Sequence, residues 1–185
     1  MERIVHSKEI QTVSILKDPG QSDSYYYIPM VGLSLGSKRL AVSARSLSIK
    51  PDGRGGTVVD AGSTIMSLVK PAFSKLKEAV LGTVKLPMAN QIVEDYETCF
   101  ILEKGVEMGT VHIPPLVLHF DGGANMTLVR NNFFQEPRPG LMCLAVVSGG
   151  FSLSVIGNVQ QQDLYIVFDI LNSKFLFAPK RCDRV

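Results

Sequence analysis

The sequence lacks several features that would assign it to common classes of protein. Its 19 basic and 17 acidic residues give a net charge of +2, and no basic block stands out. Nucleic acid is therefore not an expected partner. No apolar run approaches the roughly 18 residues that a membrane span needs, so we expect no membrane partner either. Residues 1–8 contain no apolar stretch typical of a secretory signal, so the protein is either not exported or a piece whose natural start is missing.

Residues that could hold a metal or a cofactor are also few. The three cysteines, Cys99, Cys143 and Cys182, are far apart, whereas zinc motifs need close pairs. The histidines assemble no metal site, and residues 53–56 are glycine-rich but lack the lysine and helix start of a phosphate loop. We expect no metal and no cofactor. The cysteines are either buried free thiols, or one internal disulfide plus a cysteine that pairs outside this chain.

The pattern of apolar and turn residues predicts a mainly β domain. At 185 residues with 45% hydrophobic content, the chain is long enough for one domain with a sizeable core. Short apolar, β-branched runs separated by turn residues dominate, with residues 94–100 also expected to be extended. The best helix spans residues 71–80, where Pro71 opens an apolar face at the spacing of helical turns. Asn172 and Ser173 predict a hairpin turn, and residues 1–24 are the least patterned part of the chain.

A chemically suggestive motif follows the buried strand expected at residues 57–59. Asp60 stands at the end of this strand, Gly62 allows a sharp turn, and Ser63 and Thr64 supply two hydroxyls. One interpretation is a reactive carboxylate presented at the tip of a rigid strand. The other is an aspartate that caps a turn through its own side chain.

Six collinear blocks carry a resemblance to a known family. They are residues 25–36 (YYYIPMVGLSLG), 55–64 (GGTVVDAGST), 96–100 (YETCF), 114–124 (PPLVLHFDGGA), 154–162 (SVIGNVQQQ), and 167–169 (VFD) leading to 177–179 (FAP). The chain resembles the C-terminal lobe of pepsin-type aspartic proteases, in particular the plant nepenthesin-like branch. That branch shares this module with plant xylanase inhibitors. The resemblance implies a single lobe of the pepsin-like β-barrel fold over residues 25–185, with one or two short helices.

The resemblance also assigns roles to residues of this chain. It implies that Asp60 is catalytic, one of two carboxylates that share a proton and activate a water. Ser63 is expected to hydrogen-bond the Asp60 carboxylate, and Thr64 to face substrate. Gly62 brings the backbone close to substrate. The strand of Val155, Ile156 and Gly157 is expected to support the aspartate loop, although its pattern also fits an ordinary core strand.

The sequence departs from the family at the catalytic loop. Ala61 stands where the family has serine or threonine, whose hydroxyl bonds across to the other lobe. The lobe that would supply the first aspartate is missing. Expected partners are therefore a protein or peptide substrate, and either the missing N-terminal lobe or a second copy of this chain. The leading function is aspartic endopeptidase, and the alternative is a non-catalytic binding protein like the xylanase inhibitors.

By the same resemblance, Cys99 and Cys143 form the disulfide of the lobe, and Cys182 reaches a partner in the absent lobe. Asn125, with Met126 and Thr127, forms a glycosylation sequon. The family and the sequon together predict a protein of the secretory pathway, extracellular or vacuolar.

Overall fold

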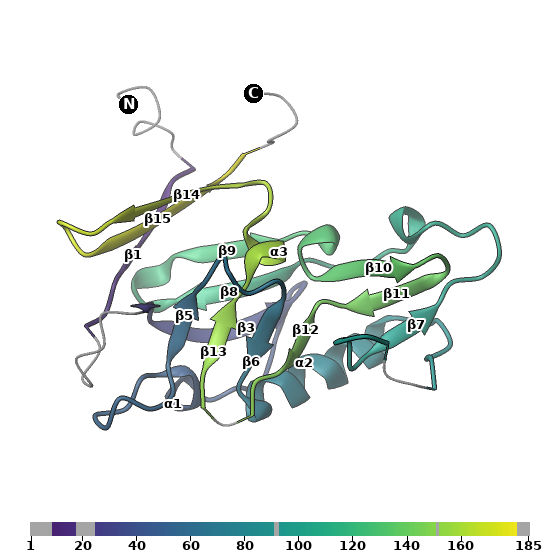
Figure 1. Ribbon diagram of the computed structural model, residues 1–185, viewed down its shortest axis with the longest axis horizontal. Coiled ribbons are helices and arrows are strands. Elements are labelled where there is room, and N and C mark those ends of the chain that lie inside the picture. The colour runs from purple at the N-terminus through teal and green to yellow at the C-terminus, as the bar shows by residue number, and fades with distance from the viewer. Residues whose placement is uncertain (1–8, 18–24, 91–92, 151, 181–185) are drawn as a thin grey trace.

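The computed structural model describes residues 9–17, 25–90, 93–150 and 152–180, and this part of the chain is mainly β (Figure 1). The strands are β1 Gln11–Ser14, β2 Tyr26–Tyr27, β3 Met30–Leu35, β4 Lys38–Arg39, β5 Thr57–Val59, β6 Met66–Leu68, β7 Cys99–Ile101, β8 Leu116–Phe120, β9 Asn125–Leu128, β10 Phe134–Arg138, β11 Leu141–Leu144, β12 Val146–Ser148, β13 Ser154–Ile156, β14 Leu164–Asp169 and β15 Lys174–Pro179. The described helices are α1 Ala44–Leu47, α2 Lys70–Thr83 and α3 Asn158–Gln161, with 3-10 turns η1 Met108–Thr110, η2 Asp121–Gly123 and η3 Arg130–Asn132. The sequence predicts one or two short helices. The described residues form α2 and, in addition, α1 and α3, which are single turns of four residues each.

The strands form four sheets. Five strands in the order β12-β6-β13-β5-β2 form the sheet at the centre of Figure 1. The sheet β4-β3-β8-β9 packs with it, β10-β11-β7 extends to one side, and β1-β15-β14 stands at the other end. The mainly β expectation is confirmed.

The central sheet has an interleaved topology. Strand β13 pairs in parallel with β5 on one side and contacts β6 on the other through Val155 and Ser67. Since β5 and β6 are close in sequence, residues 60–65 connect them across the end of β13. Because β5 and β13 run parallel, the residues that follow them, Asp60 and Gly157, meet at the same edge of the sheet.

Helix α2 closes the core beneath this sheet. Pro71 lies in its first turn, where a missing N–H costs no hydrogen bond. Its buried residues, Ala72, Phe73, Leu76 and Val80, form the apolar face predicted from the sequence and belong to the main hydrophobic core. The helix extends three residues beyond the expected end. No helix in the described ranges is long and apolar enough to cross a membrane.

One expectation about local structure needs correction. Residues 94–98 are not extended: a tight turn reverses the chain at Glu94, which has a positive φ of 54°, and Val93 and Tyr96 exchange backbone hydrogen bonds. Only Cys99–Ile101 continues as a strand. In addition, the weakly patterned N-terminal segment contributes β1, which pairs with β15 from Gln11 to Ser14 and buries Val13.

The hairpin turn predicted at Asn172 and Ser173 joins β14 to β15. The Asn172 side chain donates to Asp169 Oδ2 at 2.7 Å, and its backbone N–H donates to Asp169 Oδ1 at 3.1 Å. The Asn172 side-chain bond, followed by its backbone bond, lowers the pKa of Asp169 from its ordinary value of 3.8. The ionised carboxylate is therefore the form that holds the turn closed.

This turn predicts a pH dependence. Because the folded pKa of Asp169 is lowered, its stabilisation is present above pH 3.8 and is lost as pH falls through the folded pKa, below 3.8. A carboxyl ¹³C NMR titration should give a midpoint below 3.8 for Asp169. Replacing Asn172→Ala should move this midpoint toward 3.8. An unchanged midpoint in the variant would contradict the assignment of the shift to Asn172.

Candidate active site

The carboxylate of Asp60 is held by its own loop. Its Oδ1 accepts a hydrogen bond from the Gly62 backbone N–H at 2.8 Å, and its Oδ2 accepts one from Ser63 Oγ, also at 2.8 Å. Together the two bonds fix the plane of the carboxylate. The bond from Ser63 is the one that the resemblance implied. Asp60 is half-buried, whereas Ala61, Gly62 and Thr64 are exposed, so a second molecule can reach this face of the loop.

The end of β13 supports the loop from below. The Asp60 N–H donates to the Ile156 carbonyl at 3.1 Å, which ties the aspartate to the neighbouring strand. Gly157 follows β13 where the loop passes over it. A Cβ atom at Gly157 would lie 2.6 Å from the Ile65 carbonyl oxygen and 2.9 Å from that of Ser63. Only glycine fits beneath the crossing loop.

Helix α3 continues this support. The N–H groups of Asn158 and Val159 donate to the carbonyls of Ser63 and Thr64 at 2.7 and 3.0 Å. These are amides of the first helical turn, which have no partner within the helix. The structure thus brings Ile156 and Gly157 together with the Asp60 loop, while Val155 pairs with Val58 and Ser67 in the flanking strands. The residues after Gly157 are in direct contact with the loop.

Two buried amides anchor α3, and sequence reasoning assigned them no role. Gln160 Nε2 donates to the carbonyls of Asn132 and Ala145 at 2.8 and 3.0 Å. Asn132 Nδ2 in turn donates to the carbonyls of Val159 and Gln162 at 3.2 and 2.8 Å. This reciprocal pair joins α3 to η3. The signal available in the sequence was the polar run at residues 160–162, separated by three residues from the strand that ends at Ile156.

The loop offers one carboxylate where acid–base chemistry of this kind needs two. In the described part of the chain, both hydrogen-bond partners of the Asp60 carboxylate belong to residues 62 and 63. No group of three or more His, Cys, Asp or Glu residues that could hold a metal occurs among the described residues. The geometry suits a carboxylate that accepts or shares a proton with a group brought by another molecule.

The expected disulfide is present. Cys99 of β7 and Cys143 of β11 lie opposite each other in the antiparallel pair and are joined. Both cysteines belong to a small second core that also contains Val93, Tyr96 and Val159 of α3. Cys182 lies outside the described residues.

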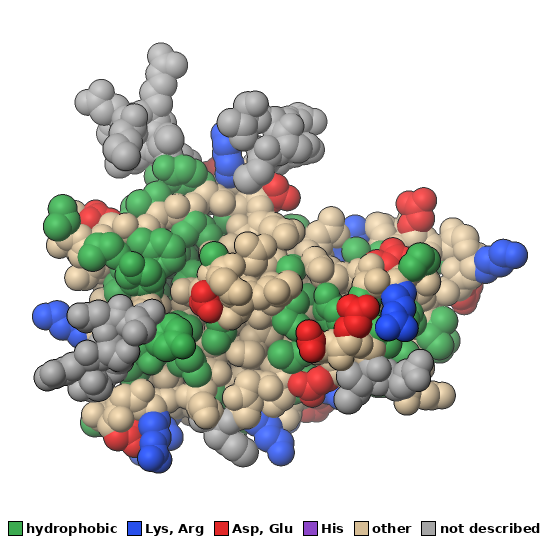
Figure 2. Space-filling model, in the orientation of Figure 1, with side chains coloured by type: hydrophobic (Ala, Val, Ile, Leu, Met, Phe, Trp, Pro, Cys, Tyr) green, Lys and Arg blue, Asp and Glu red, His purple; other side chains and the backbone are tan. Residues whose placement is uncertain are grey.

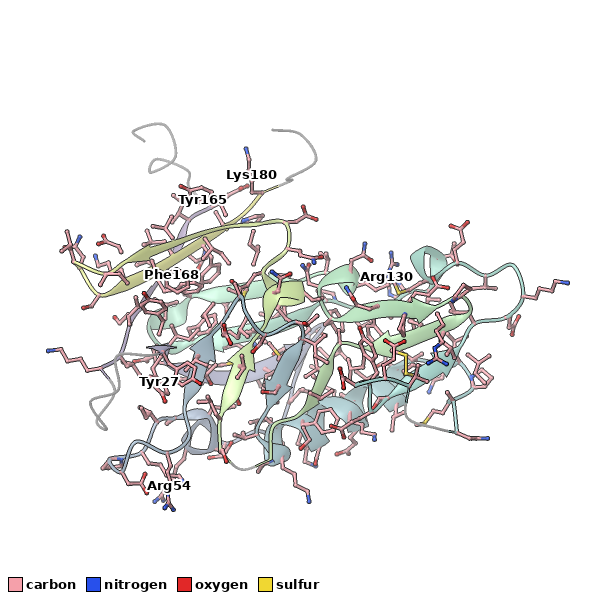
Figure 3. The ribbon with its side chains drawn as sticks, viewed as in Figure 1. Tyr27, Arg54, Arg130, Tyr165, Phe168 and Lys180 are labelled. Carbon is pink, nitrogen blue, oxygen red and sulfur yellow. A yellow bond between two sulfur atoms is a disulfide. The ribbon has the colours of Figure 1, made fainter. Side chains whose placement is uncertain are left out.

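An apolar surface covers the sheet β1-β15-β14 and the adjoining β2. Ile170 and Leu171 at the hairpin tip are 53% and 98% exposed, and Tyr25 and Tyr26 are 47% and 40% exposed. The Tyr26 ring stacks on Phe168 with centroids 4.6 Å apart, and Figure 3 shows Phe168 beneath the β14-β15 hairpin. Figure 2 shows hydrophobic side chains gathered at this end of the molecule. Tyr26 pairs with Val59, so this surface begins beside the Asp60 loop.

Comparison with known families and proteins identifies the chain. Residues 25–179 match the family described as "Xylanase inhibitor C-terminal". This chain belongs to that family. Nepenthesin-1 of Nepenthes gracilis, named an aspartic proteinase, is 34% identical over 163 residues, which is 88% of this chain and 37% of that protein. Aspartyl protease family protein 2 of Arabidopsis thaliana is 32% identical over 91% of this chain and 34% of its own length. The chain therefore spans about a third of these relatives.

Solved structures confirm the fold of this chain. The crystal structure of edgp superimposes on this chain with a TM-score of 0.78 at 22% identity. The match covers 94% of this chain and 46% of the edgp chain. Conglutin gamma from lupine seeds gives a TM-score of 0.73 at 15% identity, over 96% of this chain and 42% of its own. The recognition as a pepsin-like C-terminal lobe of nepenthesin-like type is confirmed.

The crossing at Gly157 predicts a specific intolerance. Gly157→Ala should destabilise the lobe by roughly 1–3 kcal/mol, since the added methyl meets backbone oxygens that cannot move aside independently. The matched control is Gly82→Ala in α2, where a Cβ meets nothing within 4 Å. That substitution should stabilise by about 1 kcal/mol through helix propensity. Chemical denaturation of both variants measures the contrast, and equal stabilities would contradict the crowding at Gly157.

Proposed function

We propose that this chain is the second catalytic lobe of an aspartic endopeptidase, with Asp60 as one of the two catalytic carboxylates. The observation that carries the proposal is the Asp60 carboxylate, fixed by Gly62 N–H and Ser63 Oγ at the end of β5 with one face open. The names of the relatives as aspartic proteinases support it.

The chemistry follows from the electrostatics of paired carboxylates. Two carboxylates a few ångströms apart share one proton, because both cannot ionise cheaply. The ionised member takes a proton from a water, which attacks the scissile carbonyl, while the protonated member polarises that carbonyl. In this scheme Gly62 and Thr64, both exposed beside Asp60, contact the peptide. Asp60 supplies one half of the pair, and another lobe must supply the other.

The partner in this proposal is an N-terminal lobe that brings the first aspartate. The apolar surface formed by Tyr25, Tyr26, Phe168, Ile170 and Leu171 supports a partner at this position, because exposed apolar groups adjoining a site mark an interaction surface. A second copy of this chain is the other candidate, and it would place two Asp60 loops together. The secretory route predicted from the sequence is supported by the Cys99–Cys143 disulfide, which persists in oxidising compartments.

A binding protein on the same scaffold is the second candidate function. Ala61 favours it, because this exposed position lacks the hydroxyl that the active family carries. The family description, which names a xylanase inhibitor, points the same way. In this alternative, the lobe would provide a rigid surface that binds a cell-wall-degrading glycosidase.

A chimera tests the catalytic proposal directly. The matched region of nepenthesin-1 would be replaced by residues 25–179 of this chain, and pepstatin-sensitive cleavage of denatured haemoglobin measured at about pH 3–4, within the range where such dyads titrate. We expect cleavage, and we expect Asp60→Asn to lower kcat by about 10²–10⁴-fold, the contribution of a positioned acid or base. The matched control is Asp52→Asn, an exposed loop carboxylate that should leave kcat unchanged.

The outcomes separate the candidates. A folded chimera without activity, together with inhibition of a xylanase by the chain itself, would replace the peptidase proposal with the binding protein. Activity of the chain alone that rises with protein concentration and is lost in Asp60→Asn would identify the second copy as the partner.

Position 61 gives a further prediction. In the chimera, Ala61→Thr should raise kcat by about 2- to 10-fold, the effect of one hydrogen bond worth roughly 0.5–1.5 kcal/mol across the two lobes. The isolated chain should show no change in thermal midpoint, because Ala61 is exposed there and the hydroxyl would have no partner lobe to bond. A stabilised isolated chain with unchanged chimera kinetics would show that the hydroxyl acts within the lobe.

A further inference from the structure

The sequon of the chain lies on one open face of a strand. Asn125 and Thr127 are two residues apart on β9, whose burial alternates so that both are exposed while Met126 and Leu128 are buried. Strand β9 is the edge of the sheet β4-β3-β8-β9, so no further strand covers its outer side within that sheet. Asparagine and threonine therefore point to the same accessible side of the strand.

A groove runs alongside these two residues. It has a volume of about 380 Å³ and separates β9 from the sheet β1-β15-β14, two elements that lie close together in Figure 1. We call it the β9 groove. Asn125 and Thr127 form one wall, Leu164, Phe177 and Pro179 contribute apolar atoms, and Glu9 and Gln11 contribute polar groups. A lining that mixes apolar and polar groups suits one sugar ring, whose faces are apolar and whose rim carries hydroxyls.

Both polar atoms of the Asn125 side-chain amide form hydrogen bonds. The His119 ring bonds to Asn125 Oδ1 through Nδ1, and His119 Nε2 bonds to Ser34 Oγ at 2.7 Å. Asn125 Nδ2 donates one hydrogen to the Gly123 carbonyl at 2.9 Å. An amide nitrogen has two hydrogens, so substitution of one leaves the other as a donor. A sugar on Nδ2 is thus compatible with the described bonds of Oδ1 and Nδ2.

We propose that Asn125 carries an N-linked glycan whose first N-acetylglucosamine lies in the β9 groove and joins β9 to the terminal sheet. The attachment point stands in the wall of the groove, so the sugar reaches the groove without any change of backbone. This contact would link β9 to β1, β14 and β15, of which β1 comes from the weakly patterned N-terminal segment. The proposal concerns a surface distinct from the Asp60 loop and does not depend on catalysis.

The modification is a group transfer from a lipid-linked diphosphate oligosaccharide. The bond between sugar C1 and the diphosphate oxygen breaks, and a bond between C1 and Asn125 Nδ2 forms. The displaced Nδ2 proton passes to a base of the transferase, and the lipid diphosphate leaves. No oxidation or reduction occurs.

The first experiment asks whether the glycan is present. The full chain, preceded by a cleavable secretion leader, would be expressed in a eukaryotic host and weighed by intact-mass spectrometry. We expect one glycan on the natural sequence and on Thr127→Ser, which keeps the sequon, and none on Thr127→Ala. A natural chain secreted without a glycan would overturn the proposal.

The second experiment asks whether the sugar lies in the groove. Endoglycosidase trimming leaves one N-acetylglucosamine on Asn125, and the same sequence made in the bacterial periplasm carries none. We expect the trimmed protein to unfold at a temperature higher by about 2–4 °C, as a modest contact gives in a chain of this length. We also expect slower hydrogen exchange in β9 and β15. Equal midpoints and equal exchange would overturn the docked position.

A matched pair of variants localises the contact. Leu164→Ser, in the groove, should abolish most of the difference between the sugar-bearing and sugar-free forms. Leu171→Ser, at the exposed hairpin tip, should leave that difference unchanged. The comparison within each variant cancels any general loss of stability. Equal differences in both variants would overturn the assignment to the groove. None of these measurements requires peptidase activity.

Discussion

The crossing of residues 60–65 over the end of β13 is the constraint on which the site depends. Since β13 lies between β5 and β6, the link between those strands cannot take a short path in the plane of the sheet. It must rise over Gly157, and that crossing lifts Asp60 to the surface while the Ile156 carbonyl and the Asn158 and Val159 amides hold the loop from beneath. The half-buried position of the carboxylate at the edge of the sheet is therefore a consequence of strand order.

The sequence predicted those parts of the fold whose signals are local. The apolar face of α2, the turn at Asn172 and the strand before Asp60 each have a short-range cause, and all three are present. Structure set by distant partners was not predictable. Strand β1 forms because β15 offers an edge. The apolar run at residues 141–147 reads as one strand, yet it divides at Ala145 between two sheets, where Phe133, Met66 and Gln160 each bond its backbone.

The candidate site divides in the same way. Asp60, Gly62 and Ser63 interact within four residues, so their motif was legible and the hydrogen bond from Ser63 could be expected. The Asn132–Gln160 pair joins residues 28 apart, and each amide gains its role only because the fold brings η3 against α3. The N–H groups of the two amides donate to backbone carbonyls at this junction, which an apolar side chain could not do. Sequence pattern alone cannot name such partners.

The hydrogen bonds within the loop show which part of the site this lobe provides by itself. Both carboxylate oxygens of Asp60 accept hydrogen bonds from within the lobe. The orientation of the carboxylate therefore does not depend on another subunit. A partner would contribute a second carboxylate and exclude water. A peptidase lobe and a binding protein can therefore share every supporting contact described here, because those contacts stabilise the scaffold. The distinction lies at the exposed face, in position 61 and in whatever meets Tyr26 and Leu171. A chain can keep this fold without keeping peptidase activity, because activity depends on the residues that face the partner.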